Sequence, residues 1–130
     1  MALLVVDGGE SLALQYLVNK ATPQNLILEL FTSNTTPAET DVIGTYTLAS
    51  GNGYSNITLT GASWTASGTT QIAYAQQTFT FTGALGNVYG YLLKRATGGE
   101  LILAERFTGA PFNIANNGDQ IKVTPIITAD

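Results

Sequence analysis

The segment 78–82 constrains the fold more than any other part of the chain. It reads Thr-Phe-Thr-Phe-Thr, so two aromatic rings alternate with three hydroxyl groups. Successive side chains of a strand point to opposite faces of its sheet, and this alternation therefore predicts a strand with one buried and one polar face. We expect Phe79 and Phe81 to belong to a hydrophobic core.

Other segments predict further strands, separated by turn residues. Residues 88–95 and 100–108 predict a hairpin, because the Gly-containing segment 96–99 between them favours a tight turn. The remaining expected strands are residues 26–32, 45–48, 54–60 and 120–128. Residues 26–32 are apolar at nearly every position, which predicts a strand covered on both faces. Pro125, inside the last one, predicts an edge position or a bulge. Many short strands with regular turns are typical of sandwiches and barrels. We predict an all-β fold in which residues 1–130 form a single antiparallel β-sandwich of the jelly-roll type.

One short helix is expected near the N-terminus, over residues 11–20. Its apolar residues recur at spacings of three and four: Leu12, Ala13, Tyr16 and Leu17. Ser11 suits the N-cap position, and Lys20 suits the negative end of the helix dipole. The Asp-Gly-Gly sequence at residues 7–9 predicts a turn before this helix.

The apolar start of the chain, residues 1–6, has two interpretations. It is either a docking arm that clamps a neighbouring subunit or the first strand of the sandwich. The candidate interface residues are Leu3, Leu4, Val5 and Val6. The apolar run is too short for a signal segment or a membrane span. We therefore expect no contact with a membrane.

The chain contains neither histidine nor cysteine, which narrows its chemistry. A Ser-His-Asp triad and a histidine general base are both excluded. A structural zinc site would lack its two preferred ligands, and the turn containing Asp119 lacks the dense oxygen ligands that calcium needs. We expect no catalytic residue, no metal and no cofactor.

Carboxylates leave one enzymatic alternative. Two suitably spaced carboxyl groups can hydrolyse a glycosidic bond, and the candidates are Glu29, Glu100 and Glu105. Glu29 lies within an otherwise apolar run. We favour a structural interpretation, in which Glu29 faces a subunit boundary or pairs with a base such as Arg106. Glu105 and Arg106 are neighbours and point to opposite sides of a strand, so each is expected to meet a cross-strand or intersubunit partner.

Charged residues make up only 11% of the chain, well under half of the usual quarter, and the net charge is −4. A nucleic-acid-binding protein needs clustered Lys and Arg, so this composition argues against nucleic acid as a partner. A surface poor in charge suits a protein that buries much of it against neighbours. We expect a homo-oligomer.

Aromatic residues provide an alternative binding function. Tyr46, Tyr54 and Tyr74 are expected near strand ends or in loops, where exposed rings can stack on other molecules. These three residues are our candidates for contacts with a glycan.

The order of these segments resembles small structural proteins of tailed bacteriophages. The resemblance rests on turn glycines and strand patterns along nearly the whole chain: Leu17-Val18-Asn19-Lys20 at the end of a helix, the strand Leu26-Ile27-Leu28-Glu29-Leu30-Phe31-Thr32, Thr36-Pro37, Gly53-Tyr54, Phe79-Thr80-Phe81, Val88-Tyr89-Gly90-Tyr91, Gly98-Gly99-Glu100-Leu101-Ile102-Leu103, and Asn117-Gly118-Asp119-Gln120-Ile121.

This resemblance implies a capsid decoration (cement) protein with a β-sandwich fold and no enzymatic activity. Such a protein would be made in the host cytoplasm and would bind the major capsid protein on the outer surface of the virion head. A homotrimer is the oligomer that the resemblance favours. The alternative is a tail or head-fibre component, or an adhesin, that binds a host-surface glycan.

Overall fold

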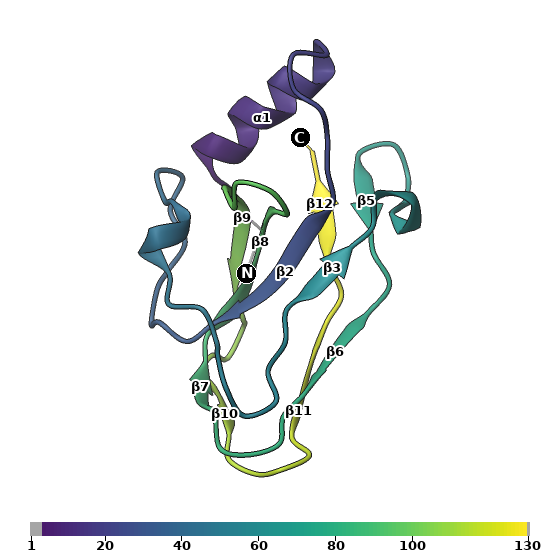
Figure 1. Ribbon diagram of the computed structural model, residues 1–130. Coiled ribbons are helices and arrows are strands. Elements are labelled where there is room, and N and C mark those ends of the chain that lie inside the picture. The colour runs from purple at the N-terminus through teal and green to yellow at the C-terminus, as the bar shows by residue number, and fades with distance from the viewer. Residues whose placement is uncertain (1–3, 130) are drawn as a thin grey trace.

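The computed structural model describes residues 4–129, which fold into antiparallel β-sheets and one short α-helix (Figure 1). This confirms the predicted all-β class with a single N-terminal helix. The elements in chain order, with η marking a 3₁₀-helix, are β1 (Leu4–Val5), α1 (Asp7–Leu17), β2 (Leu26–Phe31), η1 (Ile43–Thr45), β3 (Ile57–Leu59), η2 (Gly61–Ser63), β4 (Thr65–Ala66), β5 (Gln71–Ala73), β6 (Gln77–Thr80), β7 (Gly86–Val88), β8 (Gly90–Arg95), β9 (Leu101–Arg106), β10 (Phe112–Ile114), β11 (Gln120–Val123) and β12 (Ile126–Thr128).

The central sheet has five strands in the order β1-β9-β8-β2-β3. Its three long strands, β2, β8 and β9, have six residues each. The predicted hairpin of β8 and β9 is confirmed, as is the expectation that β2 is buried on both faces. The other strands form smaller antiparallel sheets: β10 with β7, β11 with β6, and β12 with β5 and β4.

Two hydrophobic clusters lie on opposite faces of the central sheet, because neighbouring residues of a strand alternate between its faces. The first core combines side chains of this sheet with side chains of β6, β7, β10 and β11; its buried residues are Leu28, Leu30, Ala49, Leu59, Phe79, Phe81, Val88, Tyr91, Leu93, Leu103, Ile114, Ile121 and Val123. The second core is smaller and contains Val6, Phe31, Tyr46, Leu92, Leu101 and Ala104. Phe79 and Phe81 are 3% and 0% exposed, so their predicted place in the core is confirmed.

The helix begins earlier than predicted. It starts at Asp7, so residues 7–9 form its first turn rather than a separate turn. The reason is the close approach of the helix to β9: a Cβ atom on Gly9 would lie 2.2 Å from the carbonyl oxygen of Ile102. Gly9 therefore stands where a larger residue would push the helix off the sheet. Ser11 lies within the helix and is not its N-cap.

The helix also ends earlier than predicted, at Leu17. Asn19 adopts a left-handed conformation with φ of 59°, which stops the helical path. The N–H of Asn19 donates to the carbonyl of Tyr16 at 3.1 Å, and the N–H of Lys20 donates to the carbonyl of Gln15 at 2.8 Å. These two bonds satisfy carbonyls at the helix end, and they place Lys20 beyond the last turn. Within residues 4–129 no helix is long and apolar enough to cross a membrane.

Three expected strands differ from the observed ones. Residues 45–48 make only one bridge, between Leu48 and Phe31, and follow the 3₁₀-helix η1. The strand expected over residues 54–60 is limited to β3. The expected final strand is interrupted around Pro125, and its two parts, β11 and β12, pair with β6 and β5 respectively. Proline cannot donate a ladder hydrogen bond, which explains a change of partner at this point.

The apolar start of the chain forms strand β1 at the edge of the central sheet. Leu4 lies opposite Ala104 and Val5 lies opposite Leu103. Val6 is 1% exposed and belongs to the second core. The first-strand interpretation therefore describes these residues, whereas Leu3 lies outside the described part of the chain. A contact of this segment with a neighbouring subunit stays a prediction.

Candidate functional site

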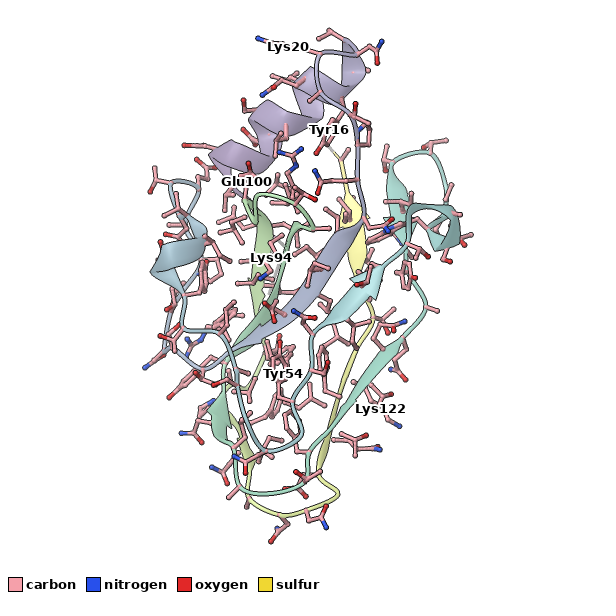
Figure 2. All side chains as sticks on the ribbon, in the orientation of Figure 1. Tyr16, Lys20, Tyr54, Lys94, Glu100 and Lys122 are labelled. Atoms are coloured by element: carbon pink, nitrogen blue, oxygen red, sulfur yellow. The ribbon has the colours of Figure 1, made fainter. Side chains whose placement is uncertain are left out.

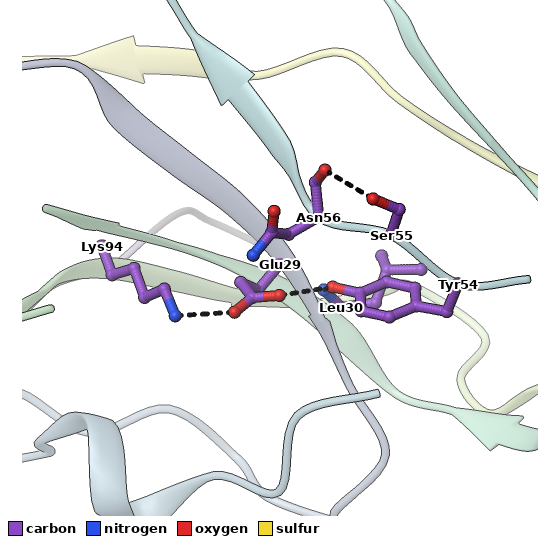
Figure 3. Close-up of polar contacts among 6 residues, drawn as sticks. All are labelled: Glu29, Leu30, Tyr54, Ser55, Asn56 and Lys94. Atoms are coloured by element: carbon purple, nitrogen blue, oxygen red, sulfur yellow. Dashed lines mark hydrogen bonds and ion pairs between the residues drawn. The ribbon is translucent and has the colours of Figure 1, made fainter. Parts of the chain in front are cut away.

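A buried carboxylate on β2 is the centre of the main polar cluster. Glu29 is 4% exposed. The ammonium group of Lys94 on β8 lies 2.7 Å from its Oε2 atom, and the hydroxyl of Tyr54 donates to its Oε1 atom at 2.7 Å (Figure 3). Both oxygens therefore have a partner. The prediction that Glu29 pairs with a base is confirmed, although the base is Lys94 and not the suggested Arg106, whose guanidinium donates to the carbonyl of Thr35.

Strand pairing explains why Lys94 reaches this carboxylate. Glu29 lies opposite Leu92, and Lys94 lies opposite Ile27. Glu29 and Lys94 are thus diagonal neighbours on one face of adjacent strands, and a long side chain spans this distance. The face is that of the second core, because Leu92 belongs to it.

Tyr54 occupies a gap in the strand ladder. Strand β3 pairs with β2 only as far as Leu28. The next N–H of β2 on the β3 side is that of Leu30, and it has no partner on β3. The Tyr54 hydroxyl accepts this N–H at 3.0 Å while it donates to Glu29. Its ring stacks on Phe79 with 5.7 Å between centroids and an angle of 13°. Burial and the hydrogen bond to Glu29 raise the pKa of Tyr54 well above its usual value.

Two more tyrosines bind carboxylates in the same way. The Tyr46 hydroxyl donates to Asp41 at 2.7 Å, and the Tyr91 hydroxyl donates to Glu105 at 2.7 Å. Burial raises the pKa of both tyrosines, and each hydrogen bond to a carboxylate adds to this rise. Tyr91 and Glu105 are directly opposite on β8 and β9, so the expected cross-strand partner of Glu105 is confirmed.

The three tyrosines proposed as glycan contacts differ in burial and in their partners. Tyr46 is only 6% exposed and packs against Phe31, so its expected exposed position was wrong. Tyr54 is half-buried, and its hydroxyl is already engaged on both sides. Tyr74 is half-buried; its hydroxyl accepts from the N–H of Thr60 at 3.2 Å, and its ring meets Trp64 edge to face. Each of the three tyrosines thus has partners of its own within the chain.

A groove of about 250 Å³ runs between the segment around Tyr54 and strand β6. One wall has Gly53, Tyr54, Ser55, Asn56 and Ile57, and the other has Thr78, Phe79 and Thr80. Strands β3 and β6 belong to different sheets, so their facing edges are not hydrogen-bonded to each other. Hydroxyl and amide side chains beside an aromatic ring are chemically suited to a small polar ligand such as a sugar.

The carboxylates considered for hydrolysis all have structural partners. Besides the pairs of Glu29 and Glu105 already described, Glu100 forms an ion pair with Arg95 at 3.3 Å. Asp119 accepts the N–H groups of Ala115 and Asn116, both at 2.9 Å, which is the geometry of a turn. Among residues 4–129, no group of three or more His, Cys, Asp or Glu side chains is placed to hold a metal ion.

Comparison with protein-family models, with curated proteins and with solved structures found no significant match to this chain. The site is therefore interpreted from its own geometry. The sequence indicated that Glu29 was unusual, since it interrupts an apolar run. It did not indicate Lys94 or Tyr54 as partners, because a diagonal pair and an edge contact both depend on strand register.

Proposed function

We propose that this chain is a non-enzymatic structural protein of a tailed-phage virion, a decoration protein that binds the major capsid protein on the outer surface of the head. We propose a homotrimer as its assembled form. The observation that carries the proposal is the exposure of large apolar side chains on separate elements: Leu14, Leu17, Val18, Val42, Ile72, Phe112 and Ile126. Exposed apolar surface, in a chain with so little charge, suits a subunit surrounded by neighbours.

The construction of the core supports the same function. The central sheet has buried clusters on both faces, and buried tyrosine–carboxylate pairs connect its strands and loops. Such a subunit resists deformation, which a protein that reinforces a shell requires. We propose that the sheets on either side of the first core form one β-sandwich of the jelly-roll type.

Strand β1 is our proposed contact with the shell. It pairs with β9 on one side only, so its other edge is open to a strand from a neighbour. The interface residues of this proposal are Leu3, Leu4 and Val5, because Val6 is committed to the second core. Addition of a strand at an open edge would join the subunit to the capsid without rearranging either fold.

Cryo-electron microscopy of particles that carry the protein tests this function. We expect density for this fold on the outer head surface, in groups of three at three-fold positions. Density confined to the tail, or purified heads that bind none of the protein, would rule out the decoration function. Binding to undecorated heads should weaken when Val5 is replaced by proline, because the N–H of Val5 points to the open edge of β1 rather than to β9. The control Val5→Ala keeps this N–H and should weaken binding less.

The groove beside Tyr54 favours a second candidate, a fibre component or adhesin that binds a host-surface glycan. Its walls bring Ser55, Asn56, Thr78 and Thr80 beside an aromatic ring. Glycan-array binding that is lost in Asn56→Ala and kept in Asn34→Ala, an exposed amide outside the groove, would support it. Absence of binding by the wild-type chain to every glycan would dismiss this candidate.

A further inference from the structure

The outward face of α1 carries an apolar stripe near the C-terminal end of the helix. Leu14, Leu17 and Val18 are 65%, 83% and 71% exposed. Their spacing of three and four residues places them side by side on one face. The buried residues of the helix, Gly9 and Leu12, occupy the opposite face. Figure 1 shows α1 at one end of the molecule, where this outward face meets no other element.

Acidic residues lie at one end of the apolar stripe and a basic residue lies at the other. Asp7 and Glu10 are exposed in the first turn, and the last turn has no basic residue. Lys20 lies just beyond the helix end and is exposed (Figure 2). The two ion pairs found within residues 4–129 involve none of these three residues. The outward surface therefore changes along the helix from acidic to apolar to basic.

We propose that this surface binds a second copy of the chain, with the two α1 helices antiparallel across a two-fold axis. Across a two-fold axis, a contact of residue i in one copy with residue j in the other is repeated, so residue j of the first copy also contacts residue i of the second. When Leu14 lies opposite Leu17 of the second copy, Glu10 comes to lie beside Lys20 of the second copy, and the contact occurs twice. A parallel arrangement would instead place the acidic ends of both helices together.

The surface chemistry favours a second copy over a lipid surface. Helices that lie on membranes carry Lys and Arg on their polar face, whereas the first turn here carries two acids. Three side chains cover only part of the roughly 800 Å² that each partner buries in a standard interface. We therefore infer a weak contact that joins larger assemblies. It does not depend on the proposed phage function, although in a trimeric decoration protein it would connect neighbouring trimers.

Disulfide trapping tests the orientation directly, because the chain has no cysteine of its own. Full-length Leu14→Cys and Leu17→Cys chains are mixed and oxidised. The antiparallel arrangement predicts that disulfides between the two variants exceed the share produced by random collision. A random distribution, or an excess of disulfides between identical variants, would overturn the proposal.

Charge reversal provides an independent test by sedimentation velocity over a range of protein concentrations. Glu10→Lys and Lys20→Glu should each weaken self-association by roughly three- to tenfold, because two exposed ion pairs become repulsive. The double variant Glu10→Lys/Lys20→Glu should recover the wild-type association constant. Failure of the double variant to recover would contradict the pairing of these two residues.

The apolar stripe is tested with Leu17→Glu. Because Leu17 is 83% exposed, we expect the circular dichroism spectrum of this variant to match that of the wild-type chain. Self-association through α1 should then fall by more than about tenfold, since two carboxylates enter the contact. The control Ala62→Glu introduces the same carboxylate at an exposed position in η2, outside the large apolar residues named above, and should leave the association constant unchanged. Equal effects of the two variants, or no concentration dependence in the wild-type chain, would refute the contact.

Discussion

The two faces of the central sheet are built differently. The first face packs against side chains of β6, β7, β10 and β11, and its buried cluster is apolar apart from the hydroxyl of Tyr91. The second face has a smaller cluster, which includes Val6 and Tyr46, and beside it lies the buried pair of Glu29 and Lys94. The side chain of Glu29 is 5% exposed and that of Lys94 is 21% exposed, so one end of this pair reaches the solvent.

This difference shows two ways of covering the face of a sheet. Strands of other sheets cover the first face, and burial of apolar area stabilises it. Val6 and, from a separate segment, η1 with Tyr46 cover the second face only in part, and a charge pair lies beside them. Burying a charge pair costs desolvation energy that good geometry offsets, so such pairs add little net stability. Our hypothesis is that the first face supplies most of the stability, whereas the second specifies strand register.

The largest loss of stability is expected from a substitution on the first face. Phe81 is 0% exposed, and Phe81→Ala should lower the free energy of unfolding by about 3–5 kcal/mol through lost burial and a cavity. Urea denaturation measures this loss. Phe112→Ala is the matched control, because that ring is 43% exposed and should cost far less. A similar loss in both variants would mean that the first core does not dominate stability.

On the second face, the loss in the free energy of unfolding depends on whether one or both charges are removed. Lys94→Met leaves the Glu29 carboxylate buried without its cation and should cost roughly 3 kcal/mol. The double variant Glu29→Leu/Lys94→Met removes both charges and should recover most of that loss. A double-mutant cycle from urea denaturation gives the coupling energy. If the double variant remains as unstable as Lys94→Met, the pair itself stabilises the protein and our hypothesis is wrong.

Gly90 tests how closely the second face is packed. It lies opposite Phe31, and a Cβ atom here would be 2.1 Å from the carbonyl oxygen of Glu105 and 2.5 Å from the Phe31 ring. Gly90→Ala should cost about 1–3 kcal/mol because the ring and strand must move. Gly44→Ala has no atom within 4 Å of its added methyl group and should change the thermal midpoint little. Equal tolerance at both positions would show that this face is loosely packed.

Tyr54 connects the two faces, since its ring stacks on Phe79 and its hydroxyl reaches Glu29. Tyr54→Phe keeps the ring and removes both hydrogen bonds of the hydroxyl. We expect a loss of roughly 1–2 kcal/mol, because the Leu30 N–H and one oxygen of Glu29 lose their partner. Chemical denaturation measures the loss. No loss at all would mean that water replaces the hydroxyl without penalty.

The raised pKa of Tyr54 and Tyr91 predicts a dependence of stability on alkaline pH. The folded state holds their protons more tightly than the unfolded state, in which tyrosine has a pKa of about 10. Stability from these hydroxyls is therefore present below about pH 10 and is lost as the pH rises further. Urea denaturation between about pH 8 and 11 should show a less steep decline for Tyr54→Phe than for the wild-type chain. Parallel declines would contradict the assigned burial of this proton.

Local patterns predicted much of the architecture. The alternation around Phe79 and Phe81, the hairpin of β8 and β9, and the apolar run of β2 all identified buried strands correctly. These patterns succeed because strand period and tight turns are properties of a few neighbouring residues. The helix limits were predicted less well. Its start depends on the contact of Gly9 with β9, which is distant in sequence.

The candidate site was less predictable than the fold. Glu29 was identifiable as a carboxylate within an apolar strand, but its partners were not. Lys94 is reached only through the register of β2 with β8, and Tyr54 only because β3 stops before Leu30. The burial of Tyr46 likewise follows from the way its segment folds over Phe31. Each of these contacts is made between residues that are far apart along the chain.

The sequence by itself determined the β class, the strong core positions and the absence of histidine and cysteine chemistry, since these follow from composition and short-range periodicity. Only the tertiary structure decided which base neutralises Glu29, which tyrosines remain accessible, and which face of α1 is left uncovered. The physical reason is that strand order, register and helix docking are set by the packing of the whole chain. No local pattern records where two distant segments will meet.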